Sequence, residues 1–280
     1  MTGRLPATLR AALVIDCHVH VVDPARFPDP SGPGYKPTLS DIGTASDLAD
    51  VLAHHRVNRA VVVQLSGHGT DNACILDAVA RSRGAWRAIV SLGPDFTDRQ
   101  LDRLQQAGAV GVRFNVKNMG PAALTQQARL LDAIAERGWV AQIQVSAPEL
   151  GDYAAFLAKV GAPLLFDHLG LPDVSAGPSE TGFKRLLAFG RDGAFIKLSG
   201  AFRLSKRPYP HSDLDPFVAA IRAAFPPLRR IWGSDWPFVD MPSKPNYAET
   251  MAMLERWLPD FDERESACEQ APARLFAWRA

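Results

Sequence analysis

The sequence predicts an α/β protein built as a single (β/α)8 TIM barrel with one extra C-terminal helix. Eight short apolar segments alternate with eight segments of helical periodicity along 280 residues, the length of one such barrel. No glycine-rich nucleotide-binding motif follows the first strand, which disfavours the competing architecture of an open doubly wound sheet. Neither a linker nor a repeat interrupts the chain, so residues 1–280 are expected to form one domain.

The eight strands are predicted from runs of β-branched and other apolar residues that end at Gly, Pro, Asp or Asn. In chain order these runs cover 13–21, 59–65, 86–92, 110–115, 140–146, 163–169, 194–199 and 230–234. In a barrel the carboxyl ends of all parallel strands meet at one mouth. Polar residues that follow these runs are therefore the candidates for an active site.

The intervening helices are predicted from apolar residues spaced three and four apart. They cover 45–56, 72–83, 98–107, 122–137, 149–160, 181–191, 213–225 and 247–257, and the tail 263–278 is the extra helix. Thr97 is a candidate N-cap, and three glycines stand where a left-handed residue would end a helix: Gly108, Gly138 and Gly161. Segment 23–41 is rich in Pro and Gly and too long for an ordinary turn, which predicts an active-site loop or lid.

The charge balance argues against a polyanionic partner. The chain has 31 Lys plus Arg against 30 Asp plus Glu, a formal net charge of +1, so we expect no nucleic acid partner. No apolar run approaches the roughly 20 residues that cross a bilayer, so we expect neither a membrane partner nor a targeting segment. The three cysteines are far apart and form no CxxC pair, which is typical of a reducing compartment and predicts a cytoplasmic protein.

The first strand carries two histidines two residues apart, in the motif DCHVH. Side chains alternate along a strand, so Asp16, His18 and His20 are expected to share one face, with Cys17 pointing away from the site. Two imidazoles in one cavity would either bind a divalent metal through nitrogen or supply two donors to a substrate oxygen. The alternative is that one histidine is a satisfied core residue and the other is exposed.

The last strand leads to a carboxylate, Asp235, which lies between Trp232 and Trp236. Asp235 is expected to face the same mouth as the histidine pair, although it could instead cap the turn that follows. His168 follows the sixth strand and is expected to join them, whereas Asp167, of opposite parity, is expected to face the helix layer.

Four further polar residues are candidates for substrate contact. Arg113, on the fourth strand, would meet either a protein carboxylate or a substrate anion, and Arg203, past the seventh strand, would be a second clamp or a solvated loop residue. Ser66 lies in the polar turn QLSGHGTDN, and Tyr35 in the long loop could reach over the mouth. No GxSxG elbow is present, so covalent catalysis by serine has no support.

Six motifs occur in an order and spacing that resemble those of the 2-pyrone-4,6-dicarboxylate lactonases, which are part of the amidohydrolase superfamily. They are DCHVHV, GHGTDN, GVRFN, FDHLGLPD, FRLS and WGSDWP, and the resemblance covers nearly the whole chain. It implies a hydrolase that opens a carboxylated lactone, with Asp235 as the general base that activates water. It implies carbonyl polarisation by His18, His20 and His168. The substrate contacts that it implies come from Arg113, Arg203, Tyr35, Ser66 and Gln144.

The resemblance implies either no cofactor or a single divalent metal, zinc or manganese. The residues that would hold the metal are the four already placed at the mouth: His18, His20, His168 and Asp235. Two metals are not expected, because the fourth and fifth strands lack the lysine and histidine of binuclear members and offer Arg113, Asn115, Gln142 and Gln144.

Two departures from the resemblance bear on specificity. Gln144 stands where the lactonases have a tyrosine, and Phe238 where they have a histidine, so we expect a related but different lactone. The expected partner is a small anionic lactone. Two alternatives stay open: a zinc-dependent decarboxylase of the same superfamily, and a barrel that binds a small acid without turning it over.

Overall fold

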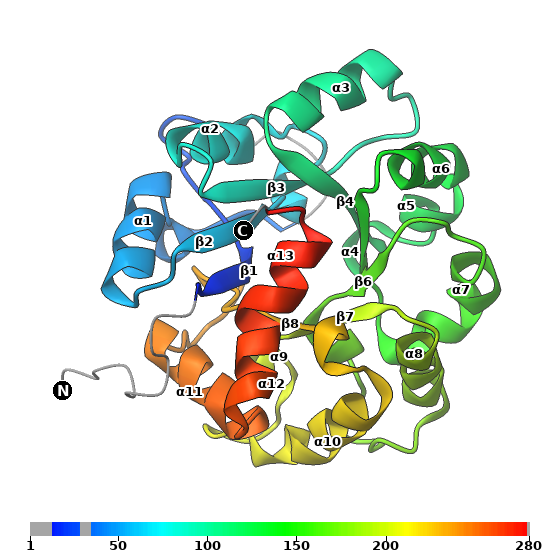
Figure 1. The fold of residues 1–280 in the computed structure, drawn as a ribbon. Helices are drawn as coiled ribbons and strands as arrows, with labels where there is room; N and C mark the ends of the chain where they lie inside the picture. Colours follow the sequence, from blue (N-terminus) through cyan, green and yellow to red (C-terminus); the bar gives the residue numbers. More distant parts are fainter. Residues whose placement is uncertain (1–12, 29–34, 279–280) are drawn as a thin grey trace.

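The protein is a nearly closed ring of parallel strands surrounded by helices, viewed along the barrel axis in Figure 1. The structure is a computed structural model that describes residues 13–28 and 35–278. One sheet holds the strands in sequence order, each parallel to the next: β1 (Ile15–Val19), β2 (Arg59–Val63), β3 (Trp86–Val90), β4 (Ala109–Asn115), β5 (Val140–Gln144), β6 (Leu164–Phe166), β7 (Phe195–Leu198) and β8 (Arg230–Trp232). The predicted (β/α)8 TIM barrel is confirmed, with each strand in its predicted run to within a few residues.

Helices alternate with the strands and form the outer layer of the barrel (Figure 1). The longer ones are α1 (Ala45–His54), α2 (Ala73–Arg81), α3 (Asp98–Gln106), α6 (Ala128–Glu136), α7 (Leu150–Leu157), α8 (Thr181–Arg191), α10 (Asp215–Ala224) and α11 (Tyr247–Trp257). Three short helices follow β4 and β7: α4 (Val116–Met119), α5 (Ala122–Thr125) and α9 (Ala201–Leu204). The helix predicted over 122–137 is therefore two helices, separated at Gln127, whose φ of −113° and ψ of 20° are not helical.

The predicted helix ends are confirmed with one exception. The Thr97 side chain accepts the backbone N–H of Gln100 at 3.2 Å, so it caps α3. Gly108 and Gly138 have φ values of 95° and 67°, the left-handed conformation that ends a helix without strain only at glycine. The expectation for Gly161 is wrong: it is not left-handed, because α7 already ends at Leu157 and Gly161 lies in the connection to β6.

Apolar side chains form two layers, one on each side of the sheet. The outer layer, between strands and helices, includes Val62, Phe114 and Ile143. The inner layer fills the barrel with alternate residues of the strands, such as Val61 and Leu165, and it also includes residues of the C-terminal segment. Inner and outer positions therefore alternate along the strands, and any polar residue at an inner position must find its partners inside the barrel.

The C-terminal segment closes the amino-terminal end of the barrel. Figure 1 shows α13 (Ala271–Leu275) crossing in front of β1 and β8. Trp278 packs into the inner layer and lies against guanidinium groups at the starts of β2 and β3. The single helix predicted over 263–278 is wrong in detail. The segment consists of α12 (Phe261–Glu265), a π-helical turn (Ser266–Gln270) and α13, and the π turn precedes Pro272, which has no N–H to donate.

The sheet closes between its first and last strands through the residues that follow β8. The backbone N–H of Asp235 donates to the His18 carbonyl at 2.7 Å, and that of His20 donates to the Trp236 carbonyl at 2.8 Å. These bonds place Asp235 directly beside the histidine pair. Within the described ranges, no helix has both the length and the apolar character needed to cross a membrane.

Candidate active site

A cavity opens at the carboxyl ends of the strands and encloses about 620 Å³ of space, part of it open to solvent. Polar and charged side chains form most of its lining: His20, Tyr35, Ser66, Arg113, Lys117, Gln144, His168, Arg203, Asp235 and Asp240. All the residues singled out from the sequence as catalytic or substrate-binding line this cavity except His18. His18 is fully buried behind His20, with its Nε2 3.3 Å from His20 Nε2. The structure thus brings the whole predicted set together.

The two histidines of β1 face the barrel interior because the strand is irregular. The pairing of β1 with β2 changes register between Asp16 and Val19, where β1 has one residue more than β2, as in a β-bulge. Cys17 consequently joins the inner layer, while Asp16 turns outward and accepts a hydrogen bond from the Tyr247 hydroxyl of α11. The expectation that Asp16 shares a face with His18 and His20, and that Cys17 points away, is therefore wrong.

Asp167 also lies on the opposite side from the prediction. It has the parity of Leu165, which belongs to the inner layer, so alternation places its carboxylate inside the barrel. Asp167 Oδ1 lies 3.4 Å from His18 Nδ1. Burial alone would raise the pKa of Asp167, but Lys197 and Arg113 hold it well below its usual range. Asp167 is thus an ionised carboxylate beneath the cavity.

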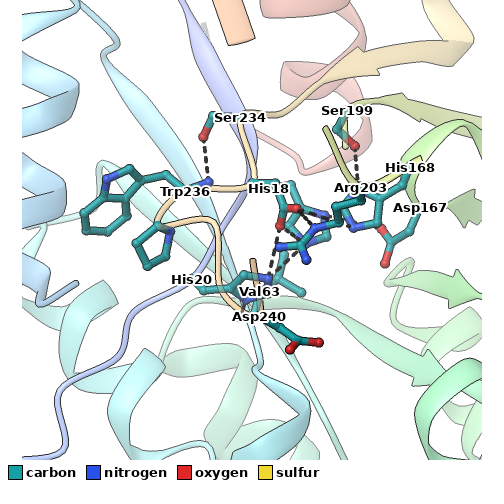
Figure 2. Close-up of polar contacts among 12 residues, drawn as sticks. His18, His20, Val63, Asp167, His168, Ser199, Arg203, Ser234, Trp236 and Asp240 are labelled. Carbon is teal, nitrogen blue, oxygen red and sulfur yellow. Dashed lines mark hydrogen bonds and ion pairs between the residues drawn. The ribbon is translucent and has the colours of Figure 1, made fainter. Parts of the chain in front are cut away.

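His168 reaches the interior because the backbone leaves the extended conformation there, with a φ of 47°. Its Nδ1 is hydrogen-bonded to Ser199 Oγ at 2.9 Å, and its Nε2 lies 4.0 Å from Asp235 Oδ2. The rings of His168 and His18 are 4.6 Å apart between centroids. Gly200 permits this packing, since a Cβ there would lie 2.8 Å from His168 Nδ1. Figure 2 shows His18, His168 and Arg203 converging.

Asp235 is buried at the mouth and holds a strained backbone conformation, with a φ of 68° that non-glycine residues rarely adopt. Its Oδ2 accepts a hydrogen bond from Arg203 Nε. Its Oδ1 lies 3.4 Å from His20 Nε2 and 3.6 Å from His18 Nε2, and it accepts no hydrogen bond from the described residues. Burial would raise the pKa of Asp235, but the Arg203 guanidinium holds it well below its usual range. The carboxylate is therefore ionised with one oxygen available.

Lys197, on β7, is a member of the site that the sequence reasoning missed. It has no exposed surface, and its Nζ lies 3.1 Å from His18 Nδ1, 2.8 Å from Gln142 Oε1 and 3.4 Å from Asp167 Oδ1. Gln142 Nε2 in turn donates to Asp167 Oδ2 at 3.1 Å. The signal that could have found Lys197 is a lone lysine at an inner position of an apolar strand, since a buried lysine requires partners.

Arg113 connects this buried group to the cavity. Its Nε lies 3.4 Å from Asp167 Oδ2, and its Nη1 donates to the Gln64 carbonyl at 3.1 Å. Of the two partners expected for Arg113, the protein carboxylate is therefore Asp167. Burial lowers the pKa of Arg113, and Asp167 opposes that shift. Because Arg113 also lines the cavity, its guanidinium lies where it can meet a ligand.

The long loop predicted over 23–41 contributes Tyr35 to the cavity, while its residues 29–34 lie outside the described ranges. The Tyr35 hydroxyl donates to Asp41. Burial, together with the neighbouring carboxylate, raises the pKa of Tyr35 to about 12, so the phenol stays protonated. The loop lies close against the turn after β2, where a Cβ on Gly67 would be 2.1 Å from the Tyr35 carbonyl oxygen.

Two more residues set the polarity of the cavity wall, and a third, Phe238, lies behind it. Gln144 on β5 has a buried Oε1 that accepts no hydrogen bond from the part of the chain that the structure describes. Lys117 of α4, not singled out from the sequence, is exposed and lines the cavity. Phe238 is buried and packs edge-on against Phe202, with ring centroids 5.4 Å apart. Because the Arg203 guanidinium lies over the Phe202 ring, Phe238 supports Arg203 from behind.

The three imidazoles at the site are neutral. Burial lowers the pKa of His18 well below its ordinary value, lowers that of His20, and lowers that of His168 to about 4. His20 Nδ1 is hydrogen-bonded to the Val63 carbonyl at 2.8 Å (Figure 2). A carbonyl only accepts, so the proton of neutral His20 is on Nδ1, and its Nε2 carries a lone pair that faces the cavity.

The atoms at the mouth have the spacing of metal ligands, but one of the nitrogens that would bind a metal carries a proton. His18 Nε2, His20 Nε2 and Asp235 Oδ1 lie 3.3, 3.4 and 3.6 Å apart. Ligands at zinc bond lengths in a tetrahedron are separated by about 3.3 Å. However, Lys197 Nζ is hydrogen-bonded to His18 Nδ1, so neutral His18 carries its proton on Nε2, where a metal would bind. Arg203 also occupies the second oxygen of Asp235. With this protonation the donor set does not fit a divalent metal.

The protein is a (β/α)8 barrel with a histidine pair on its first strand and a carboxylate after its last, all at one mouth. The chain belongs to the amidohydrolase family, whose model matches residues 15–278. The resemblance noted in the sequence motifs is thereby confirmed.

Comparison with known proteins agrees with this assignment. The 4-sulfomuconolactone hydrolase of Hydrogenophaga intermedia is 30% identical over 269 residues, which are 93% of this chain and 88% of that protein. The 2-pyrone-4,6-dicarboxylate hydrolase of Comamonas testosteroni is 28% identical over 277 residues, 94% of this chain and 89% of that protein. A crystal structure of a probable 2-pyrone-4,6-dicarboxylic acid hydrolase from Acinetobacter baumannii, with citric acid bound, has the same fold. Its TM-score is 0.84 at 24% identity, covering 95% of this chain and 99% of that one.

Proposed function

We propose that the protein hydrolyses a small lactone that carries a carboxylate, either 2-pyrone-4,6-dicarboxylate or a related compound. The observation that carries the proposal is Asp235, an ionised, buried carboxylate with one oxygen available at a cavity lined by three cations, Arg113, Arg203 and Lys117. The two relatives named as hydrolases of lactones support ring opening by water. The three cations favour an anionic substrate. Their presence at one cavity is a local feature, since the whole chain has a net charge of only +1.

In this mechanism Asp235 is the general base. It takes a proton from a water molecule whose oxygen attacks the lactone carbonyl carbon, and the ring C–O bond then breaks. The proton passes from Asp235 to the departing ring oxygen, so the products on one open chain are a hydroxyl group and a carboxylic acid, which releases the second proton of the water to solvent and becomes a carboxylate. While Arg203 is paired with Asp235, the carboxylate is a weak base. A substrate carboxylate that draws Arg203 away would raise the basicity of Asp235, which couples binding of the anion to activation of water.

The imidazoles divide into donors and an acceptor. His168 lines the cavity with its Nε2 toward Asp235, and we assign to it the polarisation of the carbonyl and the stabilisation of the oxyanion. His18, buried behind His20, donates from Nε2 to His20 Nε2. His20, whose proton is on Nδ1, cannot donate from Nε2 in its neutral form. Its role is to accept the hydrogen bond from His18 Nε2 and so to fix the direction of that N–H.

The remaining contacts follow from the cavity lining. Arg113 and Arg203 hold substrate carboxylates, since a guanidinium matches the geometry of a carboxylate. Tyr35, Ser66 and Gln144 line the same cavity, and we assign to them contacts with the ring. The free Oε1 of Gln144 suits a donor on the substrate, which an unsubstituted pyrone dicarboxylate lacks. This favours a lactone with a hydroxyl group.

The test is turnover of a panel of lactones by the purified protein. The panel contains 2-pyrone-4,6-dicarboxylate, hydroxylated lactones with a carboxylate and an uncharged lactone, each with and without added zinc or manganese. Asp235→Asn should lower kcat by about 10²–10⁴-fold with an unchanged circular dichroism spectrum. Asp192→Asn, exposed after α8 at the far end of the barrel, should have no effect. No ring opening of any anionic lactone, full activity of Asp235→Asn, or release of carbon dioxide in place of ring opening would each refute the proposal.

A further inference from the structure

Lys197 is a buried cation, and the residues around its Nζ determine which atoms accept its hydrogen bonds. A lysine ammonium has three donors and no acceptor. Lys197 Nζ lies 2.8 Å from Gln142 Oε1, 3.1 Å from His18 Nδ1 and 3.4 Å from Asp167 Oδ1. The orientation of Gln142 is fixed independently, because its Nε2 donates to Asp167 Oδ2. His18 Nδ1 is therefore left as an acceptor.

This arrangement determines where His18 carries its proton. A neutral imidazole that accepts at Nδ1 donates at Nε2. His18 Nε2 lies 3.3 Å from His20 Nε2, which is an acceptor because His20 Nδ1 donates to the Val63 carbonyl. It also lies 3.6 Å from Asp235 Oδ1. The donors then run in one direction, from Lys197 through His18 and His20 to a backbone carbonyl.

We propose that Lys197 is a positioning residue that holds His18 as the Nε2–H tautomer, so that a ring proton takes the place that a divalent ion would take between His18, His20 and Asp235. The alternative partner for His18 is present in the structure. Asp167 Oδ1 lies 3.4 Å from His18 Nδ1 and accepts no hydrogen bond from the residues described. Without the ammonium, His18 would donate from Nδ1 to Asp167, and its bare Nε2 would complete a set of metal ligands. The inference concerns the free protein and does not depend on which lactone is the substrate.

The first test uses the unaltered protein. Nuclear magnetic resonance of protein with ¹⁵N-labelled histidine distinguishes a protonated ring nitrogen from a bare one, and the spectrum of His18→Gln identifies the His18 signals. The expected result is a protonated Nε2 and a bare Nδ1 at His18, and the reverse at His20. A proton on His18 Nδ1 in the free protein would overturn the proposal.

The second test removes the donor. Lys197→Met keeps most of the side-chain length without a donor, and Lys159→Met, at an exposed position past α7, is the matched control. Titration with zinc chloride alone, followed by calorimetry, should show binding to Lys197→Met about 10–100-fold tighter than to the unaltered protein or the control. The His18 proton of Lys197→Met should move to Nδ1. Unchanged zinc affinity and an unchanged tautomer in folded Lys197→Met would overturn the proposal.

Asp167→Asn separates this role from a merely structural one. It disturbs the same buried group but leaves the Lys197 donor in place, so His18 should keep its Nε2 proton and zinc binding should stay weak. A structural role would lower the melting temperature of both variants and leave the His18 tautomer unchanged in both. A switch of the His18 tautomer in Asp167→Asn would show that Asp167, and not Lys197, determines which ring nitrogen is protonated, and would overturn the proposal. If Lys197→Met does not fold, the spectra of the unaltered protein and Asp167→Asn decide the question.

Discussion

The carboxylate of Asp16 accepts the backbone N–H of Ser234 at 2.9 Å, and this bond ties β1 to the segment that follows β8. The same oxygen accepts the N–H of His18 at 3.1 Å, and the other oxygen accepts the Tyr247 hydroxyl at 2.7 Å. Asp16 thus fixes β1 at the seam where the sheet closes, one residue from Asp235. The position of His18 relative to Asp235 depends on this buried side chain, which itself touches no part of the cavity.

Asp16 should make stability depend on pH in the opposite direction from an ordinary paired carboxylate. Burial raises its pKa from 3.8 to about 6, although its hydrogen bonds oppose the shift. Between these values the folded protein holds a proton that the unfolded chain has released, so this group makes stability fall as pH rises. Asp16→Asn removes that titration. The stability of the unaltered protein relative to Asp16→Asn should fall by about 2 kcal/mol from pH 4 to pH 7 in urea unfolding.

Ser46→Asn provides the control for this measurement, because Ser46 is exposed on α1 and neither side chain is titratable. Its difference from the unaltered protein should be constant over the same pH range. If the difference for Asp16→Asn is equally constant, Asp16 does not titrate in this window and the assigned cause is wrong.

Arg203 should control both substrate binding and the basicity of Asp235. In Arg203→Met the carboxylate loses the cation that holds its pKa low, so the acid limb of kcat/KM should move to higher pH. KM for an anionic lactone should rise by about 10–100-fold, the value of a hydrogen bond between charged groups. An uncharged lactone should show the same change in the acid limb but no rise in KM. Arg207→Met, exposed past α9, is the control; an acid limb that stays in place would show that Arg203 does not hold the base.

Lys117 should affect binding without affecting chemistry. It lines the cavity from α4 and is exposed, so its attraction to a substrate anion is weakened by solvent. Lys117→Met should raise KM for an anionic lactone by about two- to fivefold with kcat unchanged. The effect should shrink as salt is added, because the Debye length falls to about 3 Å at 1 M. A fall in kcat, or an effect that is independent of salt, would place Lys117 in another role.

The sequence predicted the barrel and the location of the site because both follow from local patterns. Apolar runs mark strands wherever both faces are buried, and the carboxyl ends of parallel strands share one mouth whatever the details of packing. For that reason His20, His168 and Asp235 were placed together without knowledge of distances. Their roles as base, donors and acceptor are not readable from the pattern, since they depend on hydrogen bonds to residues elsewhere in the chain.

The wrong predictions concern residues near positions where side chains do not alternate strictly between the two faces of a strand. The bulge in β1 reverses Asp16 and Cys17, and a bulge has no signal in a strand of ordinary composition. The side on which Asp167 lies does not follow from His168, whose φ of 47° already departs from a strand. The partners of Lys197 come from β1, β5 and the end of β6, and only the folded barrel brings these together.

Gly233 should be irreplaceable at the same seam that Asp16 closes. A Cβ at position 233 would lie 2.6 Å from His18 Cβ and 2.8 Å from His18 N, closer than carbon atoms approach in proteins. Neither atom is the end of a flexible side chain, so the steric clash can be removed only if β1 moves away from Asp235. Gly233→Ala should cost about 1–3 kcal/mol of stability, as overpacking does. It should also lower kcat by about 10²-fold, since a shift on the order of 1 Å disrupts alignment of the reacting groups.

Gly93→Ala is the matched control for this substitution. Gly93 follows β3, its backbone is not left-handed, and no atom lies within 4 Å of a Cβ placed there. Alanine at this position should leave kcat unchanged and should keep stability equal or raise it by up to about 1 kcal/mol, because it restricts only the unfolded chain. Urea unfolding and steady-state kinetics on both variants separate loss of contact geometry from loss of glycine flexibility. A stable and active Gly233→Ala would mean that β1 can move at the seam without displacing His18 from Asp235, and the close approach of the two strands would then have no part in catalysis.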